Sequence, residues 1–270
     1  MLVKLIIKLF KINIKNNFYS PYIVLVEIFS ILISLTIYWY TSKAFNLKLT
    51  DSISKYGHDY FHYLLLGEIF LSIPLTLLSG FIKKTKMLII EGTFETFISM
   101  PVNLLKPLIL LNLSDLLIEI FQIFLTLVLA YLLFGFEIPF INILQAISII
   151  IFTLPIFVAI GIVATSVLLI FGRGDNFIGY ISTLAAFGSG AFFPIDVFPE
   201  IFQKLVTTLS PYTIFLQLIR NISNHGFSNI GWNSLQVLIL WNLLIIPSIL
   251  IFNYSLKIYK KNGGFIVFTS

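Results

Sequence analysis

Long apolar runs alternate with short polar segments along the chain, and this pattern predicts six membrane-spanning helices. A bilayer crossing by a helix takes about 20 predominantly apolar residues. Five runs are close to this length or longer, at residues 22–40, 60–81, 107–134, 141–171 and 234–256. Another run, fifth in chain order, begins near Phe177 and is interrupted at residues 188–190, which read Gly-Ser-Gly. We therefore expect an all-α membrane protein with a single transmembrane domain over residues 1–270.

Polar residues outside these runs predict loops and a helix on the membrane surface. Lys43, Lys48 and Asp51 predict a polar loop after the first run, and the internal segment 83–106 is rich in lysine and glutamate. The first 18 residues are different, because Lys4, Lys8, Lys11 and Lys15 recur at helical spacing among apolar residues. This spacing predicts an amphipathic helix that lies on an anionic membrane surface. The alternative is a basic tail that only helps to orient the protein.

The positions of lysine and arginine predict the orientation in the membrane. Twelve of the 17 fall in segments on one side, at positions 4, 8, 11, 15, 83, 84, 86, 106, 173, 257, 260 and 261. The other five are at positions 43, 48, 55, 204 and 220. Basic residues concentrate on the cytoplasmic side of membrane proteins. We therefore expect both termini and segment 83–106 in the cytoplasm of a cell whose plasma or inner membrane the chain spans.

Composition narrows the class of protein. Hydrophobic residues make up 58% of the chain and charged residues only 11%, with a mean hydropathy of +1.00. Soluble domains carry about 25% charged residues, so an ordinary soluble enzyme is excluded. The chain has no cysteine, which excludes disulfides and thiol catalysis. It also lacks the glycine-rich phosphate-binding motif and the common zinc-protease and serine-hydrolase motifs. The net charge of +5 is explained by orientation and lipid contact rather than by nucleic acid.

Segment 83–106 contains a candidate surface for protein docking. Glu91 and Glu95 are four residues apart, which would place both acids on one side of a helix. An apolar stripe accompanies them, formed by Met87, Ile90, Phe94, Phe97 and Ile98. Acids beside apolar side chains favour a protein partner, and the alternative is a helix that lies on lipid.

The run 107–134 carries a polar face, and a later segment carries helix-breaking residues. The polar face consists of Asn112, Asp115, Glu119, Gln122 and Thr126, at alternating spacings of three and four. Charges in hydrocarbon are costly, so this face should point at protein or water. It either lines a transport route or dimer seam, or forms a hydrogen-bond network that fixes helix packing.

The helix breakers follow the fifth run, at Gly188, Gly190, Pro194, Pro199 and Pro211. These residues cannot all lie in one regular helix. They predict a broken, re-entrant segment over residues 190–219 on the outer side. A full crossing here would instead place the C-terminal lysines outside.

Four further residues are candidates for polar chemistry inside or beside the membrane. Glu27 and Glu68 are isolated acids, for which we expect a position near a helix end or a pairing with lysine rather than catalysis. His58 and His62 have the spacing of a metal-binding pair, but the sequence offers no third ligand beside them. We therefore expect no metal site and no catalytic residue.

Several short motifs resemble those of a known family of transporters. Residues 91–95 read Glu-Gly-Thr-Phe-Glu and residues 99–102 read Ser-Met-Pro-Val. Residues 189–194 read Ser-Gly-Ala-Phe-Phe-Pro, and Phe198-Pro199, Leu209-Ser210-Pro211-Tyr212 and Arg220 follow. In order, spacing and expected side of the membrane, these motifs resemble the six-span permease subunits of type-2 ABC exporters.

The resemblance implies partners and roles. Two permease copies, alike or different, would face each other among membrane lipids, with two cytoplasmic ATPase subunits that bind ATP and magnesium. This chain itself would bind no cofactor. Glu91, Gly92, Thr93 and Glu95 would dock the ATPase, together with the turn that contains Arg173. Hydrolysis by the partner would then move a hydrophobic or amphipathic substrate out of the cell.

Two other functions are open at this point. An ion- or proton-coupled secondary transporter would use Asp115 and Glu119 as coupling residues. A membrane-bound hydrolase would need clustered His, Asp or Ser residues, and the sequence shows no such cluster.

Overall fold

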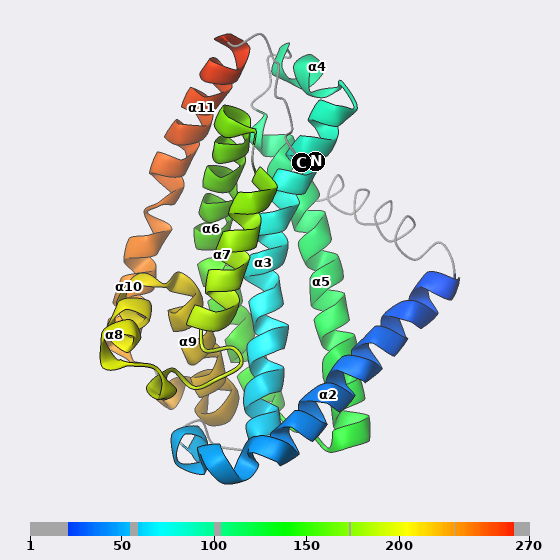
Figure 1. Ribbon diagram of the computed structural model, residues 1–270, viewed down its shortest axis with the longest axis vertical. Helices are drawn as coiled ribbons and strands as arrows, with labels where there is room; N and C mark the ends of the chain where they lie inside the picture. The colour runs from blue at the N-terminus through cyan, green and yellow to red at the C-terminus, as the bar shows by residue number, and fades with distance from the viewer. Residues whose placement is uncertain (1–20, 55–58, 100–103, 173, 230, 262–270) are drawn as a thin grey trace.

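The computed structural model describes residues 21–54, 59–99, 104–172, 174–229 and 231–261. The predicted helix over residues 1–18, together with His58 and Arg173, lies outside this part of the chain. The described residues form a helical bundle (Figure 1), which confirms the all-α prediction. In chain order its elements are α2 (Pro21–Ser54), α3 (Tyr60–Ile90), α4 (Phe94–Ser99), α5 (Leu105–Phe134), α6 (Phe140–Phe171), α7 (Gly174–Gly188), η1 (Ile195–Val197), α8 (Glu200–Leu209), α9 (Pro211–His225), η2 (Gly226–Asn229), α10 (Trp232–Asn242) and α11 (Ile245–Lys261).

Helix α3 forms the centre of the bundle. It contacts α2, α5, α6, α7 and α9, and most of its side chains are buried. Helices α5 and α6 run along α3, while α2 crosses the bundle obliquely (Figure 1). Exposed apolar side chains cover the outward faces of α2, α5 and α11, as expected where lipid or another membrane protein takes the place of water.

Within the described residues, five stretches are long and apolar enough to cross a membrane: Val24–Phe45, Tyr60–Ile90, Leu105–Phe134, Phe140–Phe171 and Trp232–Lys261. They correspond to five of the six predicted spans. The remaining one, fifth in chain order, is the 15-residue helix α7, which is too short for a full perpendicular crossing.

Two predicted boundaries were wrong because helices continue through polar residues. Helix α2 extends to Ser54, so Lys43, Lys48 and Asp51 belong to a helix and not to a loop. No glycine or proline occurs from Tyr22 to this end, so nothing in the local sequence stops the helix. Helix α3 likewise extends to Ile90 and carries the lysines at positions 83, 84 and 86 in its last turns.

The last predicted span is not one straight helix. It divides into α10 and α11 at Leu243 and Leu244. Pro247 follows four residues after Leu243, and its ring has no N–H to donate to the Leu243 carbonyl. The break therefore lies where a proline removes one bond of the helical ladder.

The chain leaves regular helix where the helix breakers after the fifth run occur. Helix α7 ends at Gly188, and Gly190 adopts a left-handed φ of 76°. Two of the downstream prolines lie immediately before helices, Pro194 before η1 and Pro199 before α8, where a missing N–H costs least. Pro211 is the first residue of α9, which continues to His225 and so passes the predicted limit at residue 219.

Candidate functional site

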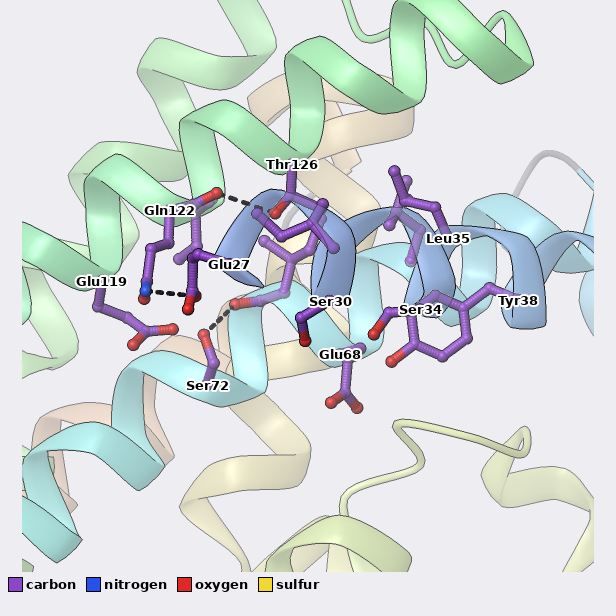
Figure 2. A pocket seen from close by; sticks show the side chains of 14 residues that line it. Glu27, Ser30, Ser34, Leu35, Tyr38, Glu68, Ser72, Glu119, Gln122 and Thr126 are labelled. Carbon is purple, nitrogen blue, oxygen red and sulfur yellow. Dashed lines mark hydrogen bonds between the residues drawn. The ribbon is translucent and has the colours of Figure 1, made fainter. Parts of the chain in front are cut away.

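Two adjoining cavities lie along α3, and acids and hydroxyls line both of them. The first, of about 180 Å³, lies between α2, α3 and α5 (Figure 2). The second, of about 350 Å³, lies between α3, α5 and α7. Glu68, Ser72 and Glu119 line both cavities. The cavities therefore form one polar region that follows α3 between its neighbours.

Polar side chains reach this region from one face of each of three helices. On these three helices, the lining residues with polar side chains are Glu27, Ser30, Ser34 and Tyr38 of α2, Glu68, Ser72, Thr76 and Ser79 of α3, and Glu119, Gln122 and Thr126 of α5. Each set is spaced by three or four residues, so each forms a single helical face. We predicted the α5 face from its spacing but missed the faces on α2 and α3. The same spacing in residues 22–40 and 60–81 would have revealed them.

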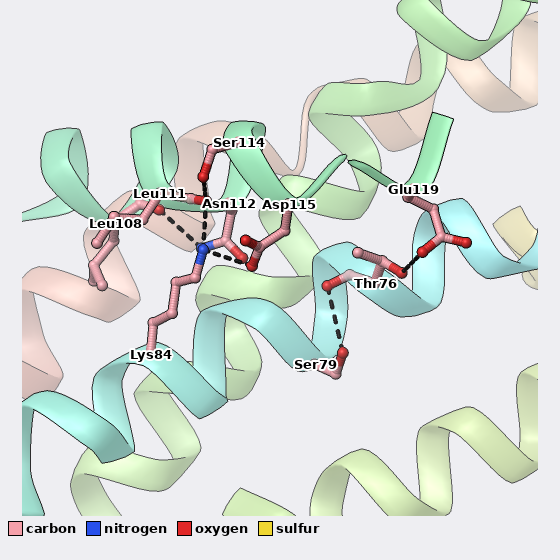
Figure 3. Close-up of polar contacts among 9 residues, drawn as sticks. All are labelled: Thr76, Ser79, Lys84, Leu108, Leu111, Asn112, Ser114, Asp115 and Glu119. Atoms are coloured by element: carbon pink, nitrogen blue, oxygen red, sulfur yellow. Dashed lines mark hydrogen bonds and ion pairs between the residues drawn. The ribbon is translucent and has the colours of Figure 1, made fainter. Parts of the chain in front are cut away.

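Hydrogen bonds connect the three polar faces. The Gln122 side chain donates to the Glu27 carboxylate at 2.6 Å, which joins α5 to α2 (Figure 2). The Thr76 hydroxyl donates to the Glu119 carboxylate at 3.0 Å, which joins α3 to α5 (Figure 3). The Tyr38 hydroxyl lies beside Glu68. Glu27 and Glu68 therefore face a shared cavity, and the partners shown for them among the described residues are Gln122 and Tyr38 rather than lysines.

The predicted polar face of α5 divides into two parts. Glu119, Gln122 and Thr126 line the cavity, whereas Asn112 and Asp115 do not. Asp115 pairs with Lys84 of α3 at 2.5 Å, and the Lys84 ammonium also donates to the Leu111 carbonyl (Figure 3).

Asn112, beside this ion pair, is almost fully buried. Its side-chain amide donates to the Leu108 carbonyl at 2.8 Å. A Cβ at Gly80 of α3 would lie only 2.2 Å from the Asn112 side-chain oxygen, so the two helices pack closely here. One part of the face thus lines a cavity, and the other joins α5 to α3.

The acidic segment predicted to dock a partner is exposed at one end of the bundle. Glu91, Gly92, Thr93 and Glu95 are all exposed, and α4 lies at the same end as the last turn of α11 (Figure 1). The prediction that the two glutamates lie on one helix was wrong, because Glu91 follows the end of α3 and Glu95 belongs to α4. Gly92 adopts a left-handed φ of 69°, and this turn separates α3 from α4. The apolar stripe is divided accordingly, since Phe94 is buried while Met87 and Ile90 are exposed.

Arg220, which we had counted among the outer basic residues, is buried inside the bundle. Its guanidinium donates to the carbonyls of Gly190 and Ala191 at 2.9 Å and of Tyr63 at 3.0 Å. It also lies 3.6 Å from the centre of the Tyr63 ring. These donors satisfy the backbone carbonyls that the break after α7 leaves without helical partners. A single arginine within the mainly apolar residues 214–222 is the sequence signal for this role.

No group of three or more His, Cys, Asp and Glu residues suited to a metal occurs in the described part of the chain. The His62 ring packs on Phe136, with ring centres 4.6 Å apart. His58, the other member of the predicted pair, lies outside the described residues.

The helical bundle, its polar intramembrane cavity and its exposed acidic turn define a multi-pass membrane protein of the transporter class. A family model described as ABC-2 type transporter matches residues 4–223, which include the cavity, the acidic turn and the break after α7. The chain belongs to this family and is a membrane permease component of an ABC transporter. The comparison with curated proteins found no match. Helices α10 and α11 lie beyond the matched residues.

Proposed function

We propose that the chain is the permease subunit of an ABC exporter in the cell membrane and moves a hydrophobic or amphipathic substrate outwards. The family match is the observation that carries this proposal, because it covers most of the chain. A separate cytoplasmic ATPase would bind ATP and magnesium and supply the energy. The exposed acidic turn at the lysine-rich end of the bundle supports a docking role for Glu91, Gly92, Thr93 and Glu95.

The polar cavity would be part of the substrate route. Carboxylates and hydroxyls inside a membrane are expensive unless protein, water or a ligand solvates them. Two permease copies would enclose this route between them. A cargo with an apolar body and a hydrogen-bonding group would fit both the polar lining and the apolar side chains around it, such as Leu71 and Phe192.

Movement of α4 would drive the transport cycle. Helix α4 follows α3 after a three-residue turn, and α3 lines both cavities. A push by the ATPase on α4 would therefore reach the cavity along α3, and the access of the cavity would alternate between the two sides of the membrane.

An ion-coupled mechanism is the second candidate, and the geometry changes which residues it would use. Asp115 is paired with Lys84, so it is less suited to bind a proton or ion than Glu119, which lines the cavity with Glu68. Transport into vesicles that contain no ATP, driven by an imposed proton gradient, would favour this mechanism over the ABC mechanism.

Charge reversal at the acidic turn tests the docking role. We expect the double variant Glu91→Lys and Glu95→Lys to lose co-purification with its ABC ATPase and the ATP hydrolysis that the complex shows. Glu137→Lys is the matched control, because Glu137 is also exposed but lies in the turn between α5 and α6, at the other end of α5. Equal association of both variants with the ATPase would remove the docking role from this turn.

A further inference from the structure

The last turn of α11 contacts both ends of α4. At the start of α4, the Phe94 ring meets Tyr259 of α11 edge to face, with ring centres 5.2 Å apart and an interplanar angle of 87°. Near the end of α4, the Lys260 ammonium lies 3.5 Å from the Ile98 carbonyl. Two consecutive residues of α11 thus contact the first residue and the penultimate residue of α4.

The two contacts differ in physical character. Phe94 is 1% exposed and Tyr259 is 4% exposed, so their contact excludes solvent. Edge-to-face aromatic pairs of this geometry are stabilising beyond their buried area. Lys260 is exposed, and its cation lies near the C-terminal carbonyls of α4, where a positive charge is favourable. The aromatic contact would therefore hold α4 in place, and the lysine would orient its end.

Contact with α11 leaves the outward face of α4 free. Glu95, Thr96 and Ser99 are exposed while Phe94 is turned inwards. The residues proposed to meet the ATPase and the residue that binds α11 are thus on different faces of one short helix. A force applied to the exposed face would press Phe94 against Tyr259.

Helix α11 offers a second path from α4 into the membrane. It packs along α6, and Phe252 of α11 lies in the same buried cluster as Phe94, Phe81 of α3 and Leu108 of α5. Because this helix lies outside the residues matched by the family model, the match does not assign it a role.

We propose that the cytoplasmic end of α11 is a tether for α4, and that Tyr259 and Lys260 make α4 and α11 move as one unit when the ATPase acts. This inference rests on the proposed function, in which the ATPase pushes on α4. Tyr259 and Lys260 are positioning residues, since they would act on the ATPase-docking turn through Phe94 and Ile98.

Spin labels can test this proposal, because the chain contains no native cysteine. One label pair, Thr96→Cys with Leu250→Cys, reports the distance between α4 and α11. A reference pair, Thr96→Cys with Tyr131→Cys, reports the distance from α4 to the far end of α5. All three positions are exposed. Both distances are measured by pulsed electron paramagnetic resonance, first in the permease alone and then in the complex with its ATPase.

In the permease alone, we expect a narrow α4–α11 distance distribution that broadens with Tyr259→Ala and is restored with Tyr259→Phe. We expect a smaller broadening with Lys260→Ala and none with its control, the neighbouring Lys261→Ala. If Tyr259→Ala does not fold, the comparison of these two lysine variants still tests the tether. An α4–α11 distribution that stays narrow in Tyr259→Ala and in Lys260→Ala would overturn the tether, whatever the ATPase does.

In the complex, trapping with ATP should shift the reference distance and leave the α4–α11 distance unchanged. A nucleotide-dependent shift of the α4–α11 distance in the parent protein would refute movement as one unit. Failure of the ATPase to bind, with no shift of the reference distance, would instead count against the proposed function. The measurements on the permease alone would then still decide whether the tether exists.

Discussion

At the residue scale, Arg220 shows how a single buried charge can stabilise irregular backbone inside a helical bundle. Its guanidinium contacts three carbonyls from two separate segments, which a lysine ammonium cannot reach with the same planar geometry. The Tyr63 and Tyr60 hydroxyls add bonds to the carbonyls of Gly190 and Phe192, at 2.5 and 2.6 Å. The break after α7 is therefore held by side chains from α3 and α9.

Gly67 provides the space that this arrangement needs. A Cβ at Gly67 would lie 2.3 Å from both the Ala191 carbonyl oxygen and an Arg220 nitrogen. We expect Gly67→Ala to lower the free energy of unfolding by about 1–3 kcal/mol, as overpacking does in closely packed interiors.

Gly179→Ala is the control, since nothing lies within 4 Å of a Cβ there and alanine favours a helix by about 1 kcal/mol. Unfolding by denaturant in detergent micelles measures both changes. A Gly67→Ala protein as stable as its parent would show that Arg220 and Ala191 move apart at little cost.

At the element scale, periodicity predicted the helices well and their ends poorly. The apolar runs identified five long apolar helical stretches and the break at Gly188, because hydrophobic length and helix breakers act locally. The ends of α2 and α3 were missed because lysine is a good helix former and continues a helix beyond the hydrocarbon. The pairing of Asp115 with Lys84 was also missed, since it depends on the register between α3 and α5.

Helical periodicity also explains why the site predicted on α5 was only partly right. Residue spacing places Asn112, Asp115 and Glu119 on one face of a helix, but it contains no information on which part of that face meets another helix. That division depends on small residues such as Gly80, which lets α5 approach α3 at Asn112. Residues farther along, such as Gln122, lie where the helices leave a cavity.

The Lys84–Asp115 pair should behave as a coupled unit in stability measurements. Each partner is less than one-third exposed, so removal of one leaves the other charge poorly solvated. We expect Lys84→Met and Asp115→Asn each to destabilise the protein, and the double variant to lose less than the sum, with a coupling of about 1–3 kcal/mol.

The control for this cycle pairs Asp115→Asn with Lys257→Met, which removes an exposed lysine of α11. Those two changes should be additive in chemical unfolding experiments. Additivity in the Lys84–Asp115 cycle as well would mean that the ion pair contributes nothing to the packing of α5 against α3.

At the scale of the whole molecule, the bundle has two chemically different ends. The end that carries α4 also carries the lysines of the last turns of α3 and α11. At the other end, the turn between α5 and α6 contains Glu137 and no lysine or arginine, and the C-terminal part of α2 carries Lys43 and Lys48. Family membership establishes a transporter component, and this asymmetry predicts which end faces the ATPase.

Thiol labelling in intact cells tests that orientation. We expect Glu137→Cys to react with a membrane-impermeant maleimide added outside, and Glu91→Cys to react only after the cells are permeabilised. Both positions are exposed and the native chain has no cysteine, so reactivity reports the side of the membrane rather than burial. Labelling of Glu91→Cys in intact cells would place the acidic turn outside, where no cytoplasmic ATPase could reach it, and the proposed coupling through α4 and α11 would then be physically impossible.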